Sequence, residues 1–579
     1  MMSDTSEVKM DPVGSFADLE AVRLKSERLG PLPLLNHFIA RLGLEELLGR
    51  FVPTHDRRCA LPYGTALGVL LRSILVEREP IYRQHEVVST FAPAAFGLTA
   101  DQAQGLHDDQ IGRALDRLFD ADRGTLLTEI LLAVQERFRL HVDELHNDST
   151  SIRFAGQYEP ANGRFLRGQR APFITYGYSK DHRPDLKQLL FIVTTTTDGG
   201  VPLEFRHADG NTSDSKTHLE TWQRLRAIAG RADFLYVADS KLCSGEAMEA
   251  IDRQHGRFVT VLPRSRKEDS LFRRWAQDHE PAFELARDRP NPRRRHAARD
   301  RWWVFRSPLG SQEGWPIVWV FSALLRVRQQ RRRLERIAAA TLEMQWLARR
   351  LSGPKPQVYR RARVQERVET ILKHFRVRRY LRVRLKKHER HQFRQAGPGR
   401  PGPRTIFHRK TRYVWIPEWN TDEAAIAYDH RTDGMYPLLT NDRKLTPKEV
   451  LEAHKRQPAL EKRFEQLKSV FAIAPVLLKN EGRIEAFFFL YFLALLLQAL
   501  IERELRLAMQ QHQLDDLPLY PEERPQRHPT CEQVLRLFSV AQRNLLHHDG
   551  RTLRVFPPEF TERQRQVLQL LGIQESAYQ

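Results

Sequence analysis

Cysteine is scarce in this sequence of 579 residues. Only Cys59, Cys243 and Cys531 occur, far apart and without a C-x-x-C pair, which excludes a disulfide framework and a cysteine zinc site as expectations. The first residues, MMSDTSEVKMDPVGSF, also lack the apolar segment of a signal peptide. We therefore expect a protein of the reducing cytoplasm.

Long hydrophobic runs are absent as well. The longest apolar stretch, AFFFLYFLALLL at residues 486–497, is shorter than the ~20 residues needed to span a bilayer. It predicts a helix buried in the core of a protein with no membrane partner. Hydrophobic residues make up 41% and charged residues 28% of the chain, which indicates a folded protein of about three or four domains at ~150 residues each.

Positive charge is present in excess, and it is concentrated in one segment. The formal net charge is +21, and residues 321–410 contain 27 Lys or Arg against five Glu. The rest of the chain holds 66 basic and 67 acidic residues and is nearly neutral. Such a segment is often a solvated face or a disordered arm, but its charge density favours a nucleic-acid partner.

Apolar residues recur within this basic segment at helical spacing, which predicts amphipathic helices that pack on one side and present Arg on the other. The apolar positions are Leu334, Ile337, Leu342, Trp346, Val364, Val368, Ile371 and Leu372. The predicted DNA contacts are Arg331, Arg332, Arg333, Arg378 and Arg379.

Changes in periodicity divide the chain. Residues 1–20 are polar and predicted to be disordered, and 21–138 show helical spacing throughout and predict an all-α domain. From residue 139 the pattern becomes strand, strand, strand, helix, strand, helix, strand. We expect an α/β catalytic domain of RNase H-like order over 139–265 and 443–510, with a mixed five-stranded sheet flanked by helices. Residues 266–442 form the predicted basic α+β insertion, and 511–579 a linker and a small helical region.

Three carboxylates stand out in this framework. Asp148 in LHNDSTSI and Asp239 in FLYVADSK each end a short apolar run, whereas Glu461 lies in the helical pattern PALEKRFEQLKSVF. Taken singly, a strand-end Asp is commonly a turn residue and a helix Glu a surface charge. Together they suit two hard divalent ions about 4 Å apart, Mg²⁺ or Mn²⁺, which catalyse phosphodiester cleavage and transfer.

Successive blocks of the chain resemble the bacterial insertion-sequence DDE transposases. The blocks are LHNDSTSI, YGYSKDHRPDLKQLLF, GVPLEFRHADGNTSD, YVADSKLCS and DGMYPLLTND. That group carries a helix signature Y-(2)-R-(3)-E-(6)-K. Glu461 and Lys468 match it with six residues between them, whereas His454 and Gln457 stand at the Tyr and Arg positions. The departure puts hairpin-forming end chemistry in doubt.

The resemblance implies cutting and joining of the ends of a mobile DNA element by a homodimer on double-stranded DNA. Asp148 would bridge two metal ions, with Asp239 on one and Glu461 on the other. Lys468, Lys180 and Arg183 would contact phosphates, as would the residues at positions 454 and 457. Trp302 and Trp303 could stack on a base, although tryptophans of a strand-rich region more often form its core.

Two other functions fit the same sequence. A DNA-binding relative that has lost catalysis would explain the departures at His454 and Gln457. An RNase H-like nuclease without transposition would cut junctions or hybrids regardless of terminal sequence.

Overall fold

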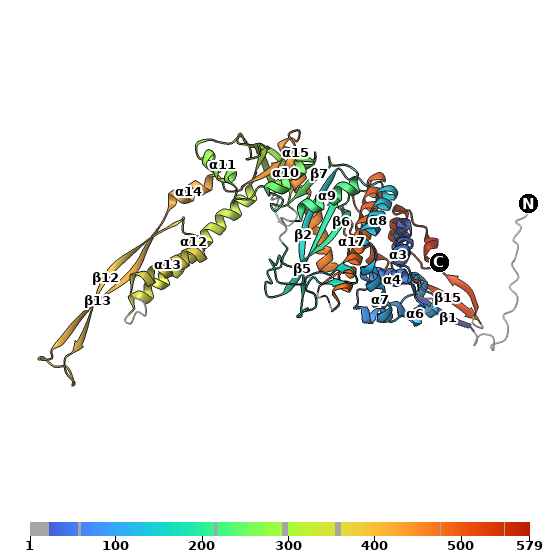
Figure 1. The fold of residues 1–579 in the computed structure, drawn as a ribbon, viewed down its shortest axis with the longest axis horizontal. Helices are drawn as coiled ribbons and strands as arrows, with labels where there is room; N and C mark the ends of the chain where they lie inside the picture. The colour runs from blue at the N-terminus through green and yellow to red at the C-terminus, as the bar shows by residue number, and fades with distance from the viewer. Residues whose placement is uncertain are drawn as a thin grey trace, which may run out of the picture. The chain divides into compact units, whose positions relative to one another are not determined.

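The computed structural model describes residues 22–579 except 56–58, 213–216, 292–298, 354–359, 475, 477, 521 and 549–550. The predicted disordered tail, residues 1–20, lies outside the described residues. The chain forms two compact units (Figure 1). Met1–Val259 and Ala453–Gln579 form the first unit, and Thr260–Glu452 form the second.

Five neighbouring strands have the order β6-β5-β2-β7-β8 and belong to a sheet of nine strands, which corrects the expected five-stranded sheet. The first three strands along the chain form an antiparallel meander, and β7 then pairs parallel to β2. Helices α9 and α10 connect β6 to β7 and β7 to β8, so the predicted element order and mixed α/β architecture are observed. The bounds are β2 (Glu144–Phe154), β3 (Phe165–Leu166), β4 (Gln169–Arg170), β5 (Lys187–Thr196), β6 (Pro202–Ala208), α9 (His218–Ala229), β7 (Leu235–Ala238), α10 (Gly245–Arg253) and β8 (Arg257–Val261).

Helices before and after this sheet in the sequence pack together in the first unit. The predicted apolar stretch belongs to a much longer helix, α17 (Glu481–Gln511), which packs against α4, α7 and β6. Among the described residues, α17 is the one helix long and apolar enough to cross a membrane, and 94% of its most apolar window is buried in the protein. The bounds of the shorter helices described in the first unit are α2 (Leu32–Leu42), α3 (Leu44–Phe51), α4 (Tyr63–Val76), η1 (Ile81–Arg83), α5 (Gln84–Ser89), η2 (Pro93–Phe96), α6 (Ala100–Gln104), α7 (Asp108–Asp120), α8 (Arg123–Phe138), α16 (Pro458–Glu465), the π-helical turn η4 (Gln466–Val470), α18 (Cys531–Leu537), α19 (Glu562–Leu570) and η5 (Glu575–Tyr578).

The two ends of the described chain meet in a small sheet, which corrects two expectations. Strand β1 (Val22–Arg28) pairs antiparallel with β15 (Gln542–His548), and β15 pairs with β16 (Arg551–Phe556). The N-terminal region is therefore not all-α, and the C-terminal region is not only helical. The sequence VRLKSER does not predict a strand, because most of its side chains are exposed and its partner strand lies more than 500 residues away.

The second unit combines strands with two long basic helices. Its strands follow the order β14-β11-β10-β9. The bounds are α11 (Lys267–Asp278), β9 (Glu284–Pro290), β10 (Arg299–Arg306), β11 (Ile317–Ser322), α12 (Ala323–Ser352), α13 (Arg361–His374), β12 (Leu381–Gln395), β13 (Phe407–Thr421), α14 (Glu423–Arg431), β14 (Met435–Thr440) and α15 (Pro447–Arg456), which runs into the first unit.

The predicted basic helices exist, but α12 buries a different stripe from the one expected. Ile337 is buried as predicted, whereas Leu334, Leu342 and Trp346 are exposed. The buried positions are Arg333, Ile337, Ala340, Met344, Leu347 and Leu351. This helix of 30 residues packs along one narrow face against α13, whose Val364, Val368 and Leu372 are buried as expected.

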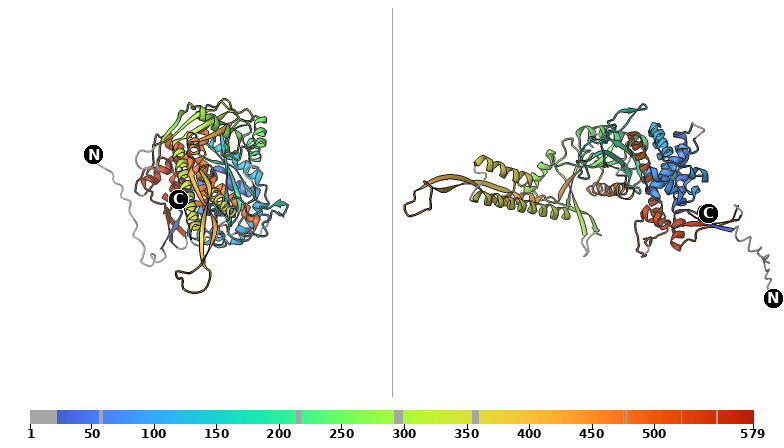
Figure 2. Two further views of the ribbon diagram at one scale, coloured as in Figure 1. Left: turned by 90° about the vertical axis from the view of Figure 1, so that its left-hand side faces the viewer. Right: turned by 90° about the horizontal axis from the view of Figure 1, so that it is seen from below.

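The last part of the basic segment is not helical. Residues 381–395 form β12, which pairs over fifteen residues with β13 in an antiparallel ribbon. Figure 2 shows this ribbon beside α12 and α13 and continuing past them. The sequence LRVRLKKHERHQFRQ alternates with period two, which is the strand periodicity rather than the helical one.

Candidate active site

Asp148 lies where parallel pairing along β2 stops. Strands β2 and β7 pair from Glu144↔Leu235 to Asn147↔Ala238, so Asp148 and Asp239 are the next residue on each strand. Strand β2 continues to Phe154 alongside β5, and Asp148 is therefore in the middle of its strand and not at its end as expected. The two carboxylates come from adjacent strands, and neighbouring strands are ~4.8 Å apart. Both lie just past the last residue pair between β2 and the short β7.

Asp239 has a histidine neighbour that the sequence did not reveal. The Nε2 atom of His218, the first residue of α9, lies 3.7 Å from Asp239 Oδ1. On its other side, His218 Nδ1 is 3.1 Å from the hydroxyl of the buried Tyr236. A single histidine without ligand spacing gives no sequence signal, so only the return of α9 toward β7 brings it to the site.

Lys180 provides the positive charge at this site. Its Nζ lies 3.1 Å from Asp148 Oδ1, 2.6 Å from the Ser149 carbonyl and 2.9 Å from Ser149 Oγ. The lysine predicted to contact a phosphate thus contacts a carboxylate in this structure. A divalent ion at Asp148 would compete with this ammonium group.

The two aspartates have pKa values that shift in opposite directions. Burial raises the pKa of Asp148 above its ordinary value, although the charge of Lys180 opposes the rise. Burial acts on Asp239 too, but His218 and the Lys241 N–H, which donates to Asp239 Oδ1 at 2.9 Å, hold its pKa below the ordinary value. Neighbouring carboxylates in different electrostatic settings are typical of functional sites.

Glu461 lies on a helix that runs alongside β2. Helix α16 packs on β2 and β5, and it lies in the sequence between α15, which carries His454, and the π-helical turn η4, which carries Lys468. At one end, His454 is close enough to His146 of β2 to sense its charge. At the other end, Lys468 Nζ is 2.7 Å from Asp181 Oδ1. Glu461, exposed to solvent, is midway between these contacts.

The three carboxylates do not form one cluster in this structure. Among the described residues, no three His, Cys, Asp or Glu side chains are near enough together to hold a metal ion. Asp148 and Asp239 are close enough to interact electrostatically, and both offer the oxygen donors that hard divalent ions prefer. Asp148 and Asp239 therefore offer oxygen donors from adjacent strands, and Glu461 does not complete the predicted set of three in this structure.

A buried ion pair fixes α16 next to this site. Arg463, two residues after Glu461 and buried where Glu461 is exposed, donates to Glu502 of α17 at 2.8 Å and to Gln466 at 2.7 Å. It also donates to the carbonyls of Gly200 at 2.9 Å and Gly199 at 2.8 Å, in the turn between β5 and β6. One guanidinium therefore joins the helix of Glu461, the core helix and the sheet.

The remaining predicted contacts near the site have different surroundings. Arg183 is exposed and forms a two-point ion pair with Asp185 at 2.8 and 2.7 Å. Gln457 occupies the position before α16. His454 is half-buried, and its assignment as a DNA contact stays a prediction.

Acid should destabilise the protein through His454. Burial, with the nearby charges of Lys455 and His146, lowers the pKa of His454 to about 3, against about 6.5 in an unfolded chain. Between these values the unfolded state binds a proton that the folded state does not, so stability falls as the pH falls from about 6.5 toward 3. At pH 5 the loss is about 2 kcal/mol.

Urea unfolding at pH 7.5 and pH 5 checks this prediction. His454→Gln should remove about 2 kcal/mol of the difference between the two pH values. His85→Gln, at an exposed position, is the control and should leave the difference unchanged. If His454→Gln shows the same pH difference as the wild type, His454 is not the group responsible.

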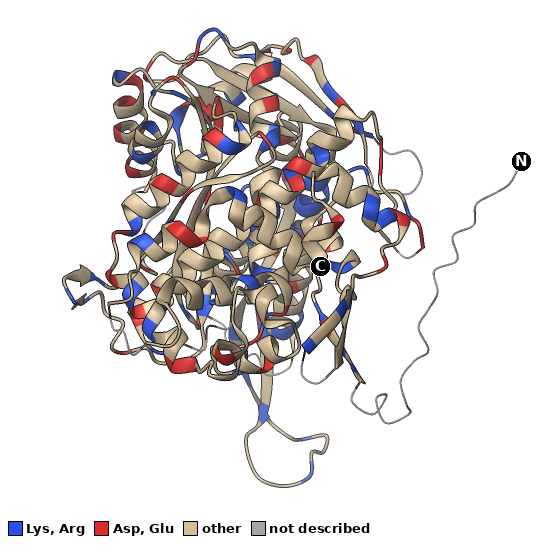
Figure 3. Ribbon diagram, turned by 90° about the vertical axis from the view of Figure 1, so that its right-hand side faces the viewer, with Lys and Arg blue, Asp and Glu red and all other residues tan. Residues whose placement is uncertain are grey.

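The predicted basic contacts of the second unit separate into exposed and buried side chains. Arg331, Arg332, Arg378 and Arg379 are exposed. Arg333 is 5% exposed and donates to both carboxylate oxygens of Asp433, at 2.8 and 2.6 Å. Arg333 is thus part of the fold, because its charge is neutralised inside the unit. In the first unit, basic and acidic residues are interspersed (Figure 3).

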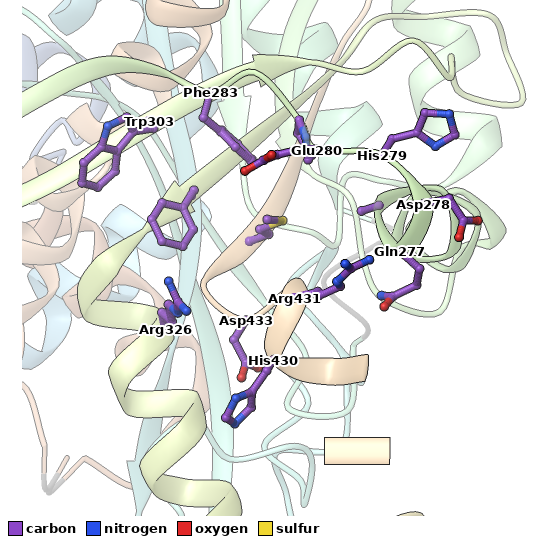
Figure 4. A pocket seen from close by; sticks show the side chains of 14 residues that line it. Gln277, Asp278, His279, Glu280, Phe283, Trp303, Arg326, His430, Arg431 and Asp433 are labelled. Atoms are coloured by element: carbon purple, nitrogen blue, oxygen red, sulfur yellow. The ribbon is translucent and has the colours of Figure 1, made fainter. Parts of the chain in front are cut away.

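The two predicted tryptophans also differ. Trp302 is only 8% exposed and belongs to the core, which corrects its assignment as a stacking residue. Trp303 lines a cavity of about 650 Å³, together with Phe283, Phe321, Arg326 and Arg431. Figure 4 shows the ring of Trp303 and the side chain of Phe283 on one side of this cavity and Arg431 on another.

Comparisons with known proteins bear on parts of the chain. Residues 24–132 match a family described as a domain of unknown function, DUF4277. No curated protein matches the chain. A solved structure of piggyBac transposase, in a synaptic complex with hairpin DNA, is similar at 10% identity with a TM-score of 0.23. That match covers 50% of this chain and 59% of the transposase chain, so the chain spans less than two thirds of it.

Proposed function

We propose that this chain is a DNA transposase of the DDE type with an RNase H-like catalytic domain, as the resemblance of its sequence blocks implies. The observation that carries the proposal is the pair Asp148 and Asp239 at the point where β2 and β7 stop pairing. The sheet order β6-β5-β2-β7-β8 and the helix of Glu461 packed on β2 support it.

Each residue of the site then has a defined task. Asp148 and Asp239 would hold the divalent ions, Mg²⁺ or Mn²⁺, with Glu461 as the third ligand. When bound, two such ions activate the attacking oxygen and stabilise the leaving 3′ oxygen. The ammonium of Lys180 opposes the rise that burial causes in the pKa of the Asp148 carboxyl.

The neighbouring residues orient this site and its substrate. His218 orients Asp239 through the Tyr236 hydroxyl behind it. Lys468 and Arg183 would bind phosphates once released from Asp181 and Asp185. A homodimer on paired DNA ends and a cytoplasmic location are part of the proposal and rest on the resemblance and the composition.

Glu461→Gln tests the third ligand, with Glu465→Gln as its matched control. Both glutamates are exposed on α16, one turn apart. The substrate is a duplex that carries the DNA flanking this gene, and the measurement is nicking in Mg²⁺. We expect Glu461→Gln to lower the nicking rate at least ~10³-fold, because a ligand of the ions is lost, and Glu465→Gln to stay within a few-fold of the wild type.

Three other outcomes would change the proposal. Loss of activity in Glu465→Gln alone would mean that the wrong glutamate is assigned. Wild-type protein that binds the flanks and Mg²⁺ but never nicks would be a DNA-binding relative without catalysis. Cleavage of junctions or hybrids irrespective of the flanking sequence would make the protein an RNase H-like nuclease.

A further inference from the structure

The β12–β13 ribbon has a distal part with no hydrophobic core. Nearer its base it packs against the helices of the second unit: Val414 is 2% exposed, and the Arg361 guanidinium of α13 lies 5.2 Å from the ring centroid of Trp415. Beyond the cross-strand pair Arg390↔Arg412, every side chain of the ribbon is exposed or half-buried. We call residues 391–411 the arm. Two strands alone are marginally stable in water, so an ordered arm needs a partner.

Charge along the arm has one sign. Residues 391–411 contain five Lys or Arg and no Asp or Glu: Arg394, Arg400, Arg404, Arg409 and Lys410. This density is higher than that of the whole chain, and no acidic residue within the arm neutralises it. The partner that best complements such a surface is a polyanion.

The alternation of β12 gathers basic residues along one face of the ribbon, from its base into the arm. Even-numbered positions from 382 to 394 share a face, and they are all basic or amide residues: Arg382, Arg384, Lys386, His388, Arg390, Gln392 and Arg394. Near the base of the ribbon, Glu418 on this face is opposite Arg384 and 3.2 Å from Lys386. Toward the arm, Arg412 is directly opposite Arg390 and Lys410 is opposite Gln392. Like charges directly opposite each other destabilise a ribbon, and bound phosphates would relieve the repulsion.

Large apolar side chains are exposed on the same arm. Phe393 is 64% exposed, Ile406 69% and Phe407 48%. Phe393 and Arg409 are a cross-strand pair, as are Gln395 and Phe407, so both rings lie near the loop end. Apolar side chains among phosphate-binding cations suit contact with the thymine methyl groups in the major groove and give no advantage on a purely solvated surface.

We propose that the arm inserts into the major groove of duplex DNA, with its basic side chains on the phosphates and Phe393 and Phe407 against the bases. The major groove admits a two-stranded ribbon. The proposal deepens the proposed function, which supplies DNA as the partner, but it concerns binding and not cleavage. The alternative occupant, a second copy of this chain, is an outcome of the test below.

The first test removes arm charge and measures binding to a random-sequence duplex by fluorescence anisotropy. The full chain is compared with Arg394→Gln/Arg409→Gln/Lys410→Gln between about 50 and 200 mM salt. Loss of three phosphate contacts should reduce the slope of log affinity against log salt by about 2.7 and weaken binding on the order of 10²-fold near 0.1 M salt. The matched control, Arg113→Gln/Arg551→Gln/Arg554→Gln, removes the same charge from exposed positions of the first unit and should change neither quantity.

The second test removes the rings without altering the charge. Phe393→Ala/Phe407→Ala should weaken duplex binding about tenfold with an unchanged salt slope, because contacts with bases release no counterions. If this variant instead changes the oligomeric mass in light scattering and leaves DNA affinity intact, the arm binds a second copy of the chain and the proposal is wrong.

An arm-deleted variant shows whether a loss of DNA binding comes from misfolding. His391 and Thr411 are directly opposite each other, so an Asn-Gly turn can replace residues 392–410. Its melting temperature should match that of the wild type, since the arm buries no core residue, while its DNA affinity should fall as in the charge variant. Wild-type affinity in both the charge and the deletion variants would overturn the proposal.

The outcome for the arm can be separated from that for the catalytic site. If the arm variants lose binding but wild-type protein never nicks DNA, the arm proposal stands and the transposase proposal fails. If the arm variants bind as the wild type does while Asp148→Asn abolishes nicking, the arm proposal fails and the transposase proposal stands.

Discussion

Asp148→Asn is expected to lower Mg²⁺-dependent nicking at least ~10³-fold, which corresponds to about 4 kcal/mol of transition-state stabilisation. The change keeps the shape of the side chain and removes the charge. Asp148 is the carboxylate nearest the lysine and the first residue past the β2–β7 pairing. Nicking of a plasmid that carries the gene's flanks measures the effect.

A control on the same segment keeps this prediction specific. Asp143→Asn lies five residues earlier, and the Asp143 side chain is 71% exposed in an ion pair with Arg231. It should leave nicking within a few-fold of the wild type. Manganese titration supplies a second measurement, in which Asp148→Asn should bind Mn²⁺ more weakly and Asp143→Asn should not. Equal nicking rates in Asp148→Asn and the wild type would remove Asp148 from the site.

Breaking the Arg463–Glu502 pair is expected to give the largest loss of stability. Both side chains are buried, and burial acts to raise the pKa of Glu502, but the cations Arg463, Lys462 and Arg506 hold it below its ordinary value. Arg463→Met would leave that carboxylate buried without its main partner. Removing one member of a buried ion pair costs about 3–5 kcal/mol, and chemical denaturation measures the loss.

Two further variants define the cause of this loss. Arg463→Met/Glu502→Leu removes both charges and should recover a large part of the lost stability, because no uncompensated charge remains. Glu335→Ala breaks the exposed Arg331–Glu335 pair and should change stability by about 1 kcal/mol or less. A double variant as unstable as Arg463→Met would show that the carbonyl contacts with Gly199 and Gly200, and not the buried charge, dominate.

The sheet was predictable because its signal is local. Runs such as KQLLFIVTTT are apolar and β-branched and give a buried strand wherever they occur, so the order of β2, β5, β6, β7 and β8 followed from the sequence. Strand β1 was missed because it forms by pairing with β15, far away in the chain. The buried face of α12 was predicted wrongly because several sets of apolar positions fit a helix of this length. Packing against α13 determines which of these sets is buried.

The residues of the candidate site also divide into those with a local sequence signal and those placed by distant parts of the chain. Asp148 and Asp239 were found from their strands, and Lys180 from its sequence block, although its contact with Asp148 was not foreseen. His218 and Arg463 gave no signal, since their roles come from the return of α9 and α17 to the sheet. Arg333 and Trp302 were assigned to DNA by charge and aromaticity, but residue type does not report burial.

The most direct test maps the ends of cut DNA. Wild-type protein is incubated in Mg²⁺ with a plasmid that carries both flanks of the gene, and the position and chemistry of each break are determined. The proposed function predicts breaks at the two element ends with free 3′-OH groups, and none with Asp148→Asn or Asp239→Asn. Breaks at unrelated positions, or the same breaks in the aspartate variants, would contradict it.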